Sequence, residues 1–213
     1  MSFLQCSGAP LGTAITWTII AWLSNGWASP LPLPTTHTRS AWKTTQYDHI
    51  TLRCGPWKSS KWCEAKAILP APIDTVLTML VDVEALPRLF PSMMSMKRIA
   101  PDTYHQVIDY PFPYNDRDLV LAFSQSWEDS THIIEWHSVD GSALPSVGVR
   151  LTQAQGRFEL RSRADGRTDI TYVWHGDVGP GVPEWIWPLA WRNQSREVVS
   201  GMISGLRPPA ATP

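Results

Sequence analysis

Alternating apolar and polar side chains form the clearest pattern in this chain, across its middle part. In the segment 156–163, Phe158 and Leu160 alternate with charged residues. Two further segments, over 117–127 and 168–177, repeat this period of two. Such a period is typical of a strand with one buried and one solvated face. The apolar positions of these two segments are Leu119, Leu121, Phe123 and Trp127, and Ile170, Tyr172 and Trp174.

Turn residues separate the strand-like segments at short intervals. Segments 100–102, 128–130 and 164–167 are built from Pro, Asp, Ser, Gly and other residues that suit tight turns. Strands joined by such turns pair with their neighbours in an antiparallel meander. A first hairpin is predicted upstream, with strands over 47–54 and 61–69, because both segments carry β-branched and aromatic residues.

Two helices are predicted around this strand-rich region. Pro72 suits the first turn of a helix, where its missing N–H group is not needed, and Val76 and Leu80 follow at helical spacing. A longer helix is expected over 184–206, because its apolar residues form one stripe. The stripe consists of Ile186, Leu189, Val198, Val199, Met202, Ile203 and Leu206.

One large antiparallel sheet and one long C-terminal helix predict an α+β fold in which the sheet curls around the helix. Hydrophobic residues make up 43% of the chain and charged residues only 17%, which is enough apolar surface for a folded core. A curled sheet of this size encloses more volume than its own side chains fill. A ligand cavity between the sheet and the helix is therefore the first functional hypothesis.

The start of the chain has the pattern of an export signal. No Lys, Arg, Asp or Glu precedes Arg39, and the apolar run 14–23 is shorter than the roughly 20 residues that span a bilayer. Gly26 and Ala28 then occupy the small-residue positions of a cleavage site. We expect a signal peptide over 1–28 and a periplasmic or secreted protein. An uncleaved membrane anchor and a misassigned start codon are the alternatives, because no Lys or Arg precedes the apolar run.

The rest of the chain divides into three parts. We expect a linker over 29–41, one domain over 42–206 and a disordered tail over 207–213. The domain holds two cysteines, Cys54 and Cys63, which flank a Gly-Pro turn and would meet across a hairpin. An exported protein permits a disulfide between them, while two separate free thiols are the alternative.

Charge and motifs exclude several functions. Lys and Arg number 18 against 19 Asp and Glu, so there is no basic surface to favour nucleic acid. The six histidines form no metal-binding pair, and the sequence holds no nucleophile elbow, dinucleotide loop or phosphate loop. We expect no cofactor, no metal site and no catalytic residues, and we expect a monomer.

Four segments in order resemble START domains, the lipid-transfer domains related to the steroidogenic acute regulatory protein. The strongest is 110–120, which contains Pro-x-Pro followed by Arg117 and Asp118. The others are 71–87, 168–172 and 179–185, and the resemblance covers about 42–206. It implies a helix-grip fold with an apolar tunnel between the sheet and the C-terminal helix, without cofactor or catalysis. It implies one bound lipid or other apolar molecule.

The residues expected to line this cavity are Arg117, Leu119, Leu121, Phe123, Trp136, Tyr172, Trp174, Leu189 and Met202. Ordinary core packing is the alternative for each of the aromatic residues. Cholesterol-binding members of the family can carry a cavity arginine where this chain has Phe123. The phenylalanine therefore disfavours a sterol that is held by contact with such an arginine. Any of Trp185, Trp187 and Trp191 that is exposed would favour transient membrane contact during ligand exchange.

Arg117 and Asp118 each allow two interpretations. Adjacent strand residues point to opposite faces, so Arg117 points inward if Leu121 does. It then either meets a ligand's polar head or pairs with a structural acid at the end of the strand. Asp118 is expected to hydrogen-bond at a turn or a sheet edge.

We therefore expect a lipid-binding or lipid-transfer protein. A polyketide cyclase or hydrolase-type enzyme on the same scaffold is the alternative, and it would need ionisable groups converging inside the cavity. A partner-binding domain with a filled interior is a third possibility.

Overall fold

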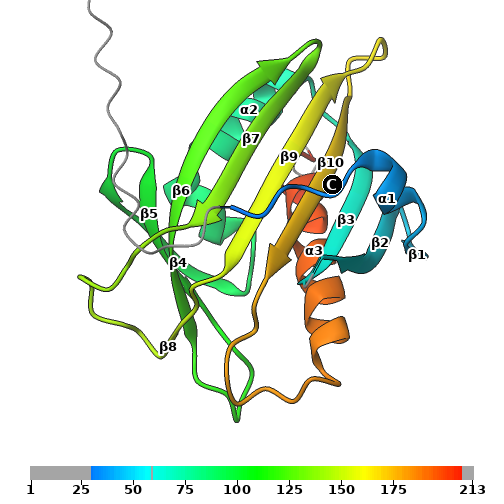
Figure 1. Ribbon diagram of the computed structural model, residues 1–213. Coiled ribbons are helices and arrows are strands. Elements are labelled where there is room, and N and C mark those ends of the chain that lie inside the picture. The colour runs from blue at the N-terminus through cyan, green and yellow to red at the C-terminus, as the bar shows by residue number, and fades with distance from the viewer. Residues whose placement is uncertain (1–29, 59, 208–213) are drawn as a thin grey trace, which may run out of the picture.

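A computed structural model of the chain describes residues 30–58 and 60–207 (Figure 1). The expected signal peptide and all of the expected tail beyond Arg207 lie outside the described residues. Within the described part, no helix combines the length and the apolar character needed to cross a membrane.

A single curved sheet of ten strands forms most of the molecule (Figure 1). Its strand order is β1-β2-β3-β10-β9-β7-β6-β5-β4, with every neighbouring pair antiparallel, and the short β8 pairs in parallel with β6. The strands are β1 Lys43–Tyr47, β2 Ile50–Trp57, β3 Ser60–Leu69, β4 Met93–Ala100, β5 Thr103–Ile108, β6 Arg117–Glu128, β7 Thr131–Ser138, β8 Val149–Arg150, β9 Ala154–Ser162 and β10 Thr168–Gly176. The predicted meander therefore begins with β4 at one edge of the sheet and ends with β10, which pairs with β3 of the first hairpin.

Tight turns connect the strands where the sequence predicts them. Asp102, Asp129 and Gly166 have positive φ values in the β4–β5, β6–β7 and β9–β10 turns, a backbone conformation that Asp and Gly tolerate better than most residues. The first hairpin differs from the prediction. Tyr47 ends β1, and the chain turns at Asp48, which also has a positive φ, before β2 begins.

Three helical segments lie beside the sheet. Helix α2, Ile73–Val81, begins after Pro72 as predicted, and the 3-10 helix η1, Val83–Arg88, follows it. The C-terminal helix α3, Trp187–Gly205, begins three residues later than expected. It packs against β2, β3 and β10, on the far side of the sheet in Figure 1.

The main core lies between the sheet and these helices. Leu160 of β9 and Ile170 of β10 pack in one cluster with Val199 and Met202 of α3, and all four are almost fully buried. The alternating strand residues and the helical stripe therefore meet in one core, as the two periodicities require.

The segment expected to be a linker instead packs on the outer face of the sheet, where it crosses the strands (Figure 1). It contains α1, Thr36–Ser40. Leu31 and Leu33 pack against Trp62 and Val173, which point outward from β3 and β10. The backbone N–H and carbonyl of Leu31 also exchange hydrogen bonds with the Gln155 side chain, at 2.7 and 2.6 Å. We call residues 30–42 the outer strap.

Two further contacts stabilise this side of the molecule. Arg39 of α1 is buried, and its Nε lies 2.9 Å from Oε2 of Glu64, which is buried in β3. Cys54 and Cys63 are directly opposite in the β2–β3 pair, with Cα atoms 4.2 Å apart, and form a disulfide. The strands thus bring together two cysteines that are nine positions apart in the sequence.

Candidate ligand-binding cavity

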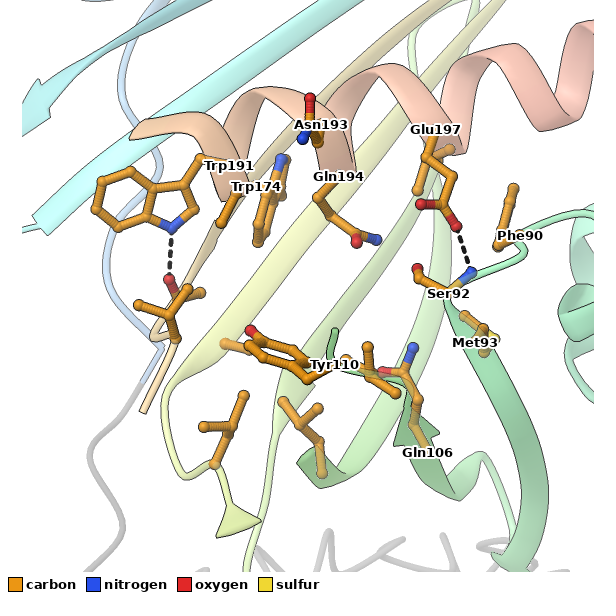
Figure 2. A pocket seen from close by; sticks show the side chains of 18 of the residues that line it. Phe90, Ser92, Met93, Gln106, Tyr110, Trp174, Trp191, Asn193, Gln194 and Glu197 are labelled. Carbon is orange, nitrogen blue, oxygen red and sulfur yellow. Dashed lines mark hydrogen bonds between the residues drawn. The ribbon is translucent and has the colours of Figure 1, made fainter. Parts of the chain in front are cut away.

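A cavity of about 320 Å³ lies between the concave face of the sheet and the first half of α3. Strands β4 to β7, β9 and β10 form its floor, and α3 forms its roof (Figure 2). Two loops, 109–116 and 177–186, contribute lining residues at one end. The cavity volume is within the range of about 300–1,000 Å³ that is typical of small-molecule sites.

Seven of the nine expected residues line this cavity. They are Leu119, Leu121, Phe123, Trp136, Tyr172, Trp174 and Leu189. Six of them lie on strands, where alternate side chains point to the same face of the sheet, here the concave one. Leu189 lies in the first turn of α3, and its side chain is half exposed at the edge of the cavity.

Met202 and Arg117 do not line the cavity. Met202 is fully buried in the core, farther along α3 than Val198, the last residue of the helix that lines the cavity. A helical stripe extends over several turns, so only its first part can face a cavity that ends halfway along the helix.

Stacked aromatic rings form much of the floor. The ring of Tyr172 is tilted by 16° from that of Phe158, with centroids 4.6 Å apart, and by only 5° from that of Trp174, with centroids 6.4 Å apart. Gly156 of β9 makes room for Trp136, because a Cβ atom at this position would lie 2.4 Å from the indole ring. The glycine therefore allows Trp136 to lie flat against the sheet.

Arg117 joins the two loops at the end of the cavity. Its side chain is buried and donates hydrogen bonds to the carbonyl oxygens of Val178, at 3.1 Å, and Pro180, at 3.0 Å. The guanidinium also lies over the ring of Tyr110, 4.6 Å from its centroid. Both expected roles were wrong, because backbone carbonyls rather than a ligand or a structural acid compensate this buried charge.

Asp118 is buried in the centre of an ionic cluster rather than exposed at an edge. Its carboxylate lies 2.6 Å from Nη2 of Arg150 and 2.7 Å from Nε2 of His105, and it accepts a hydrogen bond from Ser146 at 2.9 Å. Burial would raise the pKa of Asp118, but these hydrogen bonds outweigh it and lower the pKa to about 2. The expectation of a turn or sheet-edge role was therefore wrong.

The cavity also holds polar groups that were not predicted from the sequence. Gln106 of β5 is only 7% exposed, and its side chain points into the cavity from the floor (Figure 2). Gln194 points down from α3 (Figure 2). Glu197, also on α3, accepts a hydrogen bond from the backbone N–H of Ser92 at 2.7 Å. A glutamine at an inward position of β5, with apolar Tyr104 and Ile108 two residues to either side, was the available signal for Gln106.

Ionisable groups are few in this cavity. Asp109 and Asp177 are exposed at its rim. Burial raises the pKa of the hydroxyl groups of Tyr110 and Tyr172, so both stay protonated at neutral pH. In residues 30–58 and 60–207, no group of three or more His, Cys, Asp or Glu side chains could hold a metal ion. The arrangement is suited to enclosing an apolar molecule.

No family model matches the chain. An uncharacterized protein of Pseudomonas aeruginosa is 21% identical to it over 155 residues, which cover 68% of this chain and 76% of that protein.

Three solved structures share the fold. A STAR-related lipid transfer protein from Xanthomonas axonopodis is 20% identical, with a TM-score of 0.69 over 78% of this chain and 99% of that one. Human STARD10 is 15% identical, with a TM-score of 0.67 over 83% and 81%. The lipid transfer and protein localization domain of human StarD13 is 18% identical, with a TM-score of 0.65 over 78% and 89%. The chain therefore has the helix-grip fold of START domains, as its motifs predict.

Proposed function

We propose that this protein binds one apolar molecule in the cavity between its sheet and α3 and carries it between membranes. The observation that carries the proposal is the cavity itself, which is enclosed by a floor of apolar and aromatic side chains and by the helix. Proteins of the same fold from Xanthomonas axonopodis and humans are described as lipid transfer proteins, which supports this function.

Carriage accounts for the cavity better than the alternatives. An enzyme of the cyclase type needs ionisable groups that converge on a substrate. Asp109 and Asp177 lie exposed at the rim, and the half-buried Glu197 is held by the backbone N–H of Ser92. Gln106 and the protonated Tyr172 are the deeply buried polar side chains of the floor. A partner-binding domain without a ligand would have a filled interior, which a cavity of about 320 Å³ does not support.

The end of the cavity carries the features of a membrane-contact site. Phe112 is 96% exposed in the loop 109–116, and Trp185 is 79% exposed in the loop before α3. Both loops line the same end of the cavity, so the two rings flank the region through which a ligand would enter. Exposed aromatic rings favour the boundary between lipid and water. We propose that Phe112 and Trp185 insert into the membrane surface during exchange.

The proposed carrier acts outside the cytosol. The disulfide between Cys54 and Cys63 supports this location, because such bonds persist in oxidising compartments. The uncharged start of the chain is consistent with an export signal.

Binding is tested by native purification, solvent extraction and mass spectrometry of the extract. We expect a stoichiometric apolar molecule, or uptake of one from liposomes. Ala190→Trp should abolish binding, because Ala190 lines the cavity from α3 and a larger side chain would fill it. Ala143→Trp, in an exposed loop away from the lining, is the matched control. If the wild type neither retains nor takes up an apolar molecule, the proposed function is wrong.

Transfer is tested separately from binding. The double variant Phe112→Ser and Trp185→Ser should slow the movement of ligand between vesicles at least tenfold while its equilibrium affinity stays within about twofold, because neither side chain lines the cavity. An unchanged transfer rate would contradict the proposed membrane contact and leave the binding proposal intact.

A further inference from the structure

The polar groups of the cavity indicate which class of molecule it accepts. Gln106 is more than nine-tenths buried, lines the cavity, and its side-chain amide has no hydrogen-bond partner within the described residues. An amide that an apolar ligand shields from water without hydrogen-bonding to it costs about 1–3 kcal/mol. A ligand that hydrogen-bonds to Gln106 would remove this cost.

Gln194 supplies a second amide from the opposite wall. It lies on α3, lines the cavity, and is also without a side-chain partner in the part of the chain that the structure describes. Figure 2 shows Gln106 pointing up from the sheet and Gln194 pointing down from the helix. An amide both donates and accepts hydrogen bonds, so these two side chains suit a group that does the same.

The charges of the lining disfavour an anionic ligand. Among the lining residues that the structure describes, Asp109, Asp177 and Glu197 are acidic and none is Lys, Arg or His. Two nearby cations are engaged elsewhere: Arg117 donates to loop carbonyls, and Lys61 lies over the ring of Trp191, 5.5 Å from its centroid. A carboxylate or phosphate would lose its hydration here without a compensating positive charge.

The polar groups at depth also favour a neutral ligand over a cationic one. Asp109 and Asp177 are exposed at the rim, where water screens them. Glu197 keeps its charge, but the Ser92 N–H holds its carboxylate against the loop before β4. Gln106, the most deeply buried polar side chain that points into the cavity without a partner, is uncharged and offers no countercharge to an ammonium group.

We infer that the ligand is a neutral single-chain amphiphile, whose one uncharged polar group, a hydroxyl or an amide, hydrogen-bonds to the side chains of Gln106 and Gln194. This inference rests on the proposed binding function. The volume of about 320 Å³ supports a single chain, because it is near the lower end of the range for ligand sites. The apolar part of the ligand then lies against the aromatic floor formed by Phe158, Tyr172 and Trp174.

The test is a competition assay with ligands of equal chain length. Five ligands compete in turn with a fluorescent apolar probe for the purified protein. They are dodecanol, dodecanamide, dodecanoate, dodecyltrimethylammonium and dodecane. We expect dodecanol and dodecanamide to bind at least tenfold more tightly than the other three. Gln106→Leu should remove most of the advantage of dodecanol over dodecane while dodecane binds equally well or better, because a leucine leaves no amide unpaired.

Two variants accompany this experiment. Gln125→Leu makes the same change at an exposed position of β6 and should leave the order of ligands unchanged. Gln194→Leu, on the half-buried surface of α3, should reduce the advantage of dodecanol even if Gln106→Leu does not fold.

The possible outcomes separate the two proposals. If the probe itself does not bind the wild-type protein, the binding function is wrong. If the probe binds but dodecane, dodecanoate or dodecyltrimethylammonium binds as tightly as dodecanol, the cavity takes apolar molecules and the inference about their polar group is wrong. An unchanged ligand order in both glutamine variants would also overturn it.

Discussion

The indole Nε1–H of Trp174 donates a hydrogen bond to the Oγ of Ser195, at 2.7 Å, and both residues are buried. This bond joins β10 to α3, and Trp174 lines the cavity that the helix covers. Ser195 in turn donates to the carbonyl oxygen of Trp191 at 2.9 Å. The Trp191 indole donates to the carbonyl oxygen of Gly176 at 2.8 Å. A chain of hydrogen bonds therefore holds the first half of the helix over the sheet.

Ser195→Ala should destabilise the protein, because it leaves the Trp174 N–H buried without an acceptor. We expect a loss of about 1–3 kcal/mol in the free energy of unfolding, measured by denaturant titration. Ser204→Ala, an exposed position on the same helix, is the control and should have little effect. Equal stability of Ser195→Ala and the wild type would mean that this bond does not hold the helix in place.

The cluster around Asp118 predicts a dependence of stability on pH. Its pKa of about 2 in the folded protein is below the value of about 3.9 for an unfolded chain. The resulting stabilisation is complete above about pH 5 and is lost as the pH falls toward 1, by about 2.6 kcal/mol in total. Asp118→Asn should lower the unfolding free energy at neutral pH and flatten its decline between pH 4 and 2. Parallel wild-type and variant curves would contradict this.

The outer strap should contribute to stability through Arg39. In Arg39→Met, Glu64 stays buried with Arg53 and Lys66, each 3.6 Å away, as its remaining cations. We expect a loss of about 2–3 kcal/mol, below the roughly 3–5 kcal/mol that follows when a buried charge loses its partner altogether. Adding Glu64→Gln should recover part of this loss, and a double-mutant cycle of unfolding free energies measures the coupling. Additive effects would mean that the two residues are not coupled.

Gly201 allows α3 to approach the loop before β4. A Cβ atom at this position would lie 2.2 Å from the carbonyl oxygen of Leu89. Gly201→Ala should therefore destabilise the protein by about 1–3 kcal/mol from overpacking, although alanine in a helix interior is ordinarily about 1 kcal/mol more favourable than glycine. Thermal and denaturant unfolding both measure this. A stabilised variant would show that helix and loop can separate at no cost.

The disulfide predicts a difference between oxidised and reduced protein. Reduction should raise the intact mass by about two hydrogens and lower the unfolding free energy by about 2–3 kcal/mol, since the bond restricts a short loop of the unfolded chain. The variant with both Cys54→Ala and Cys63→Ala should not respond to reductant. A wild-type protein whose mass and stability are unaffected by reductant would contradict the bond.

The alternation of side chains, the turn residues and the position of Pro72 were enough to predict the sheet, most of its turns and the start of α2. These are local properties, because strand and helix periods and turn preferences act over a few residues. The pairing of Cys54 with Cys63 followed from the predicted hairpin, since a hairpin sets strand pairing locally. The predicted Gly-Pro turn was wrong, because Gly55 and Pro56 pair with β3 and the chain turns at Lys58. Strand alternation likewise assigned Leu121 and Tyr172 to the inner face.

Contacts between distant parts of the chain decided the role of Arg117, the packing of the outer strap and the polar lining of the cavity. Arg117 meets the carbonyls of Val178 and Pro180 only because two loops that are distant in sequence end at the same side of the sheet. The outer strap packs because Trp62 and Val173 form an apolar patch there. Gln106 and Gln194 face one cavity because the sheet curves, so that β5 lies opposite α3 across the cavity. Sequence alone determined which residues point to one side of each strand, whereas the tertiary structure decided which of these sides meet, because burial depends on partners contributed by distant parts of the chain.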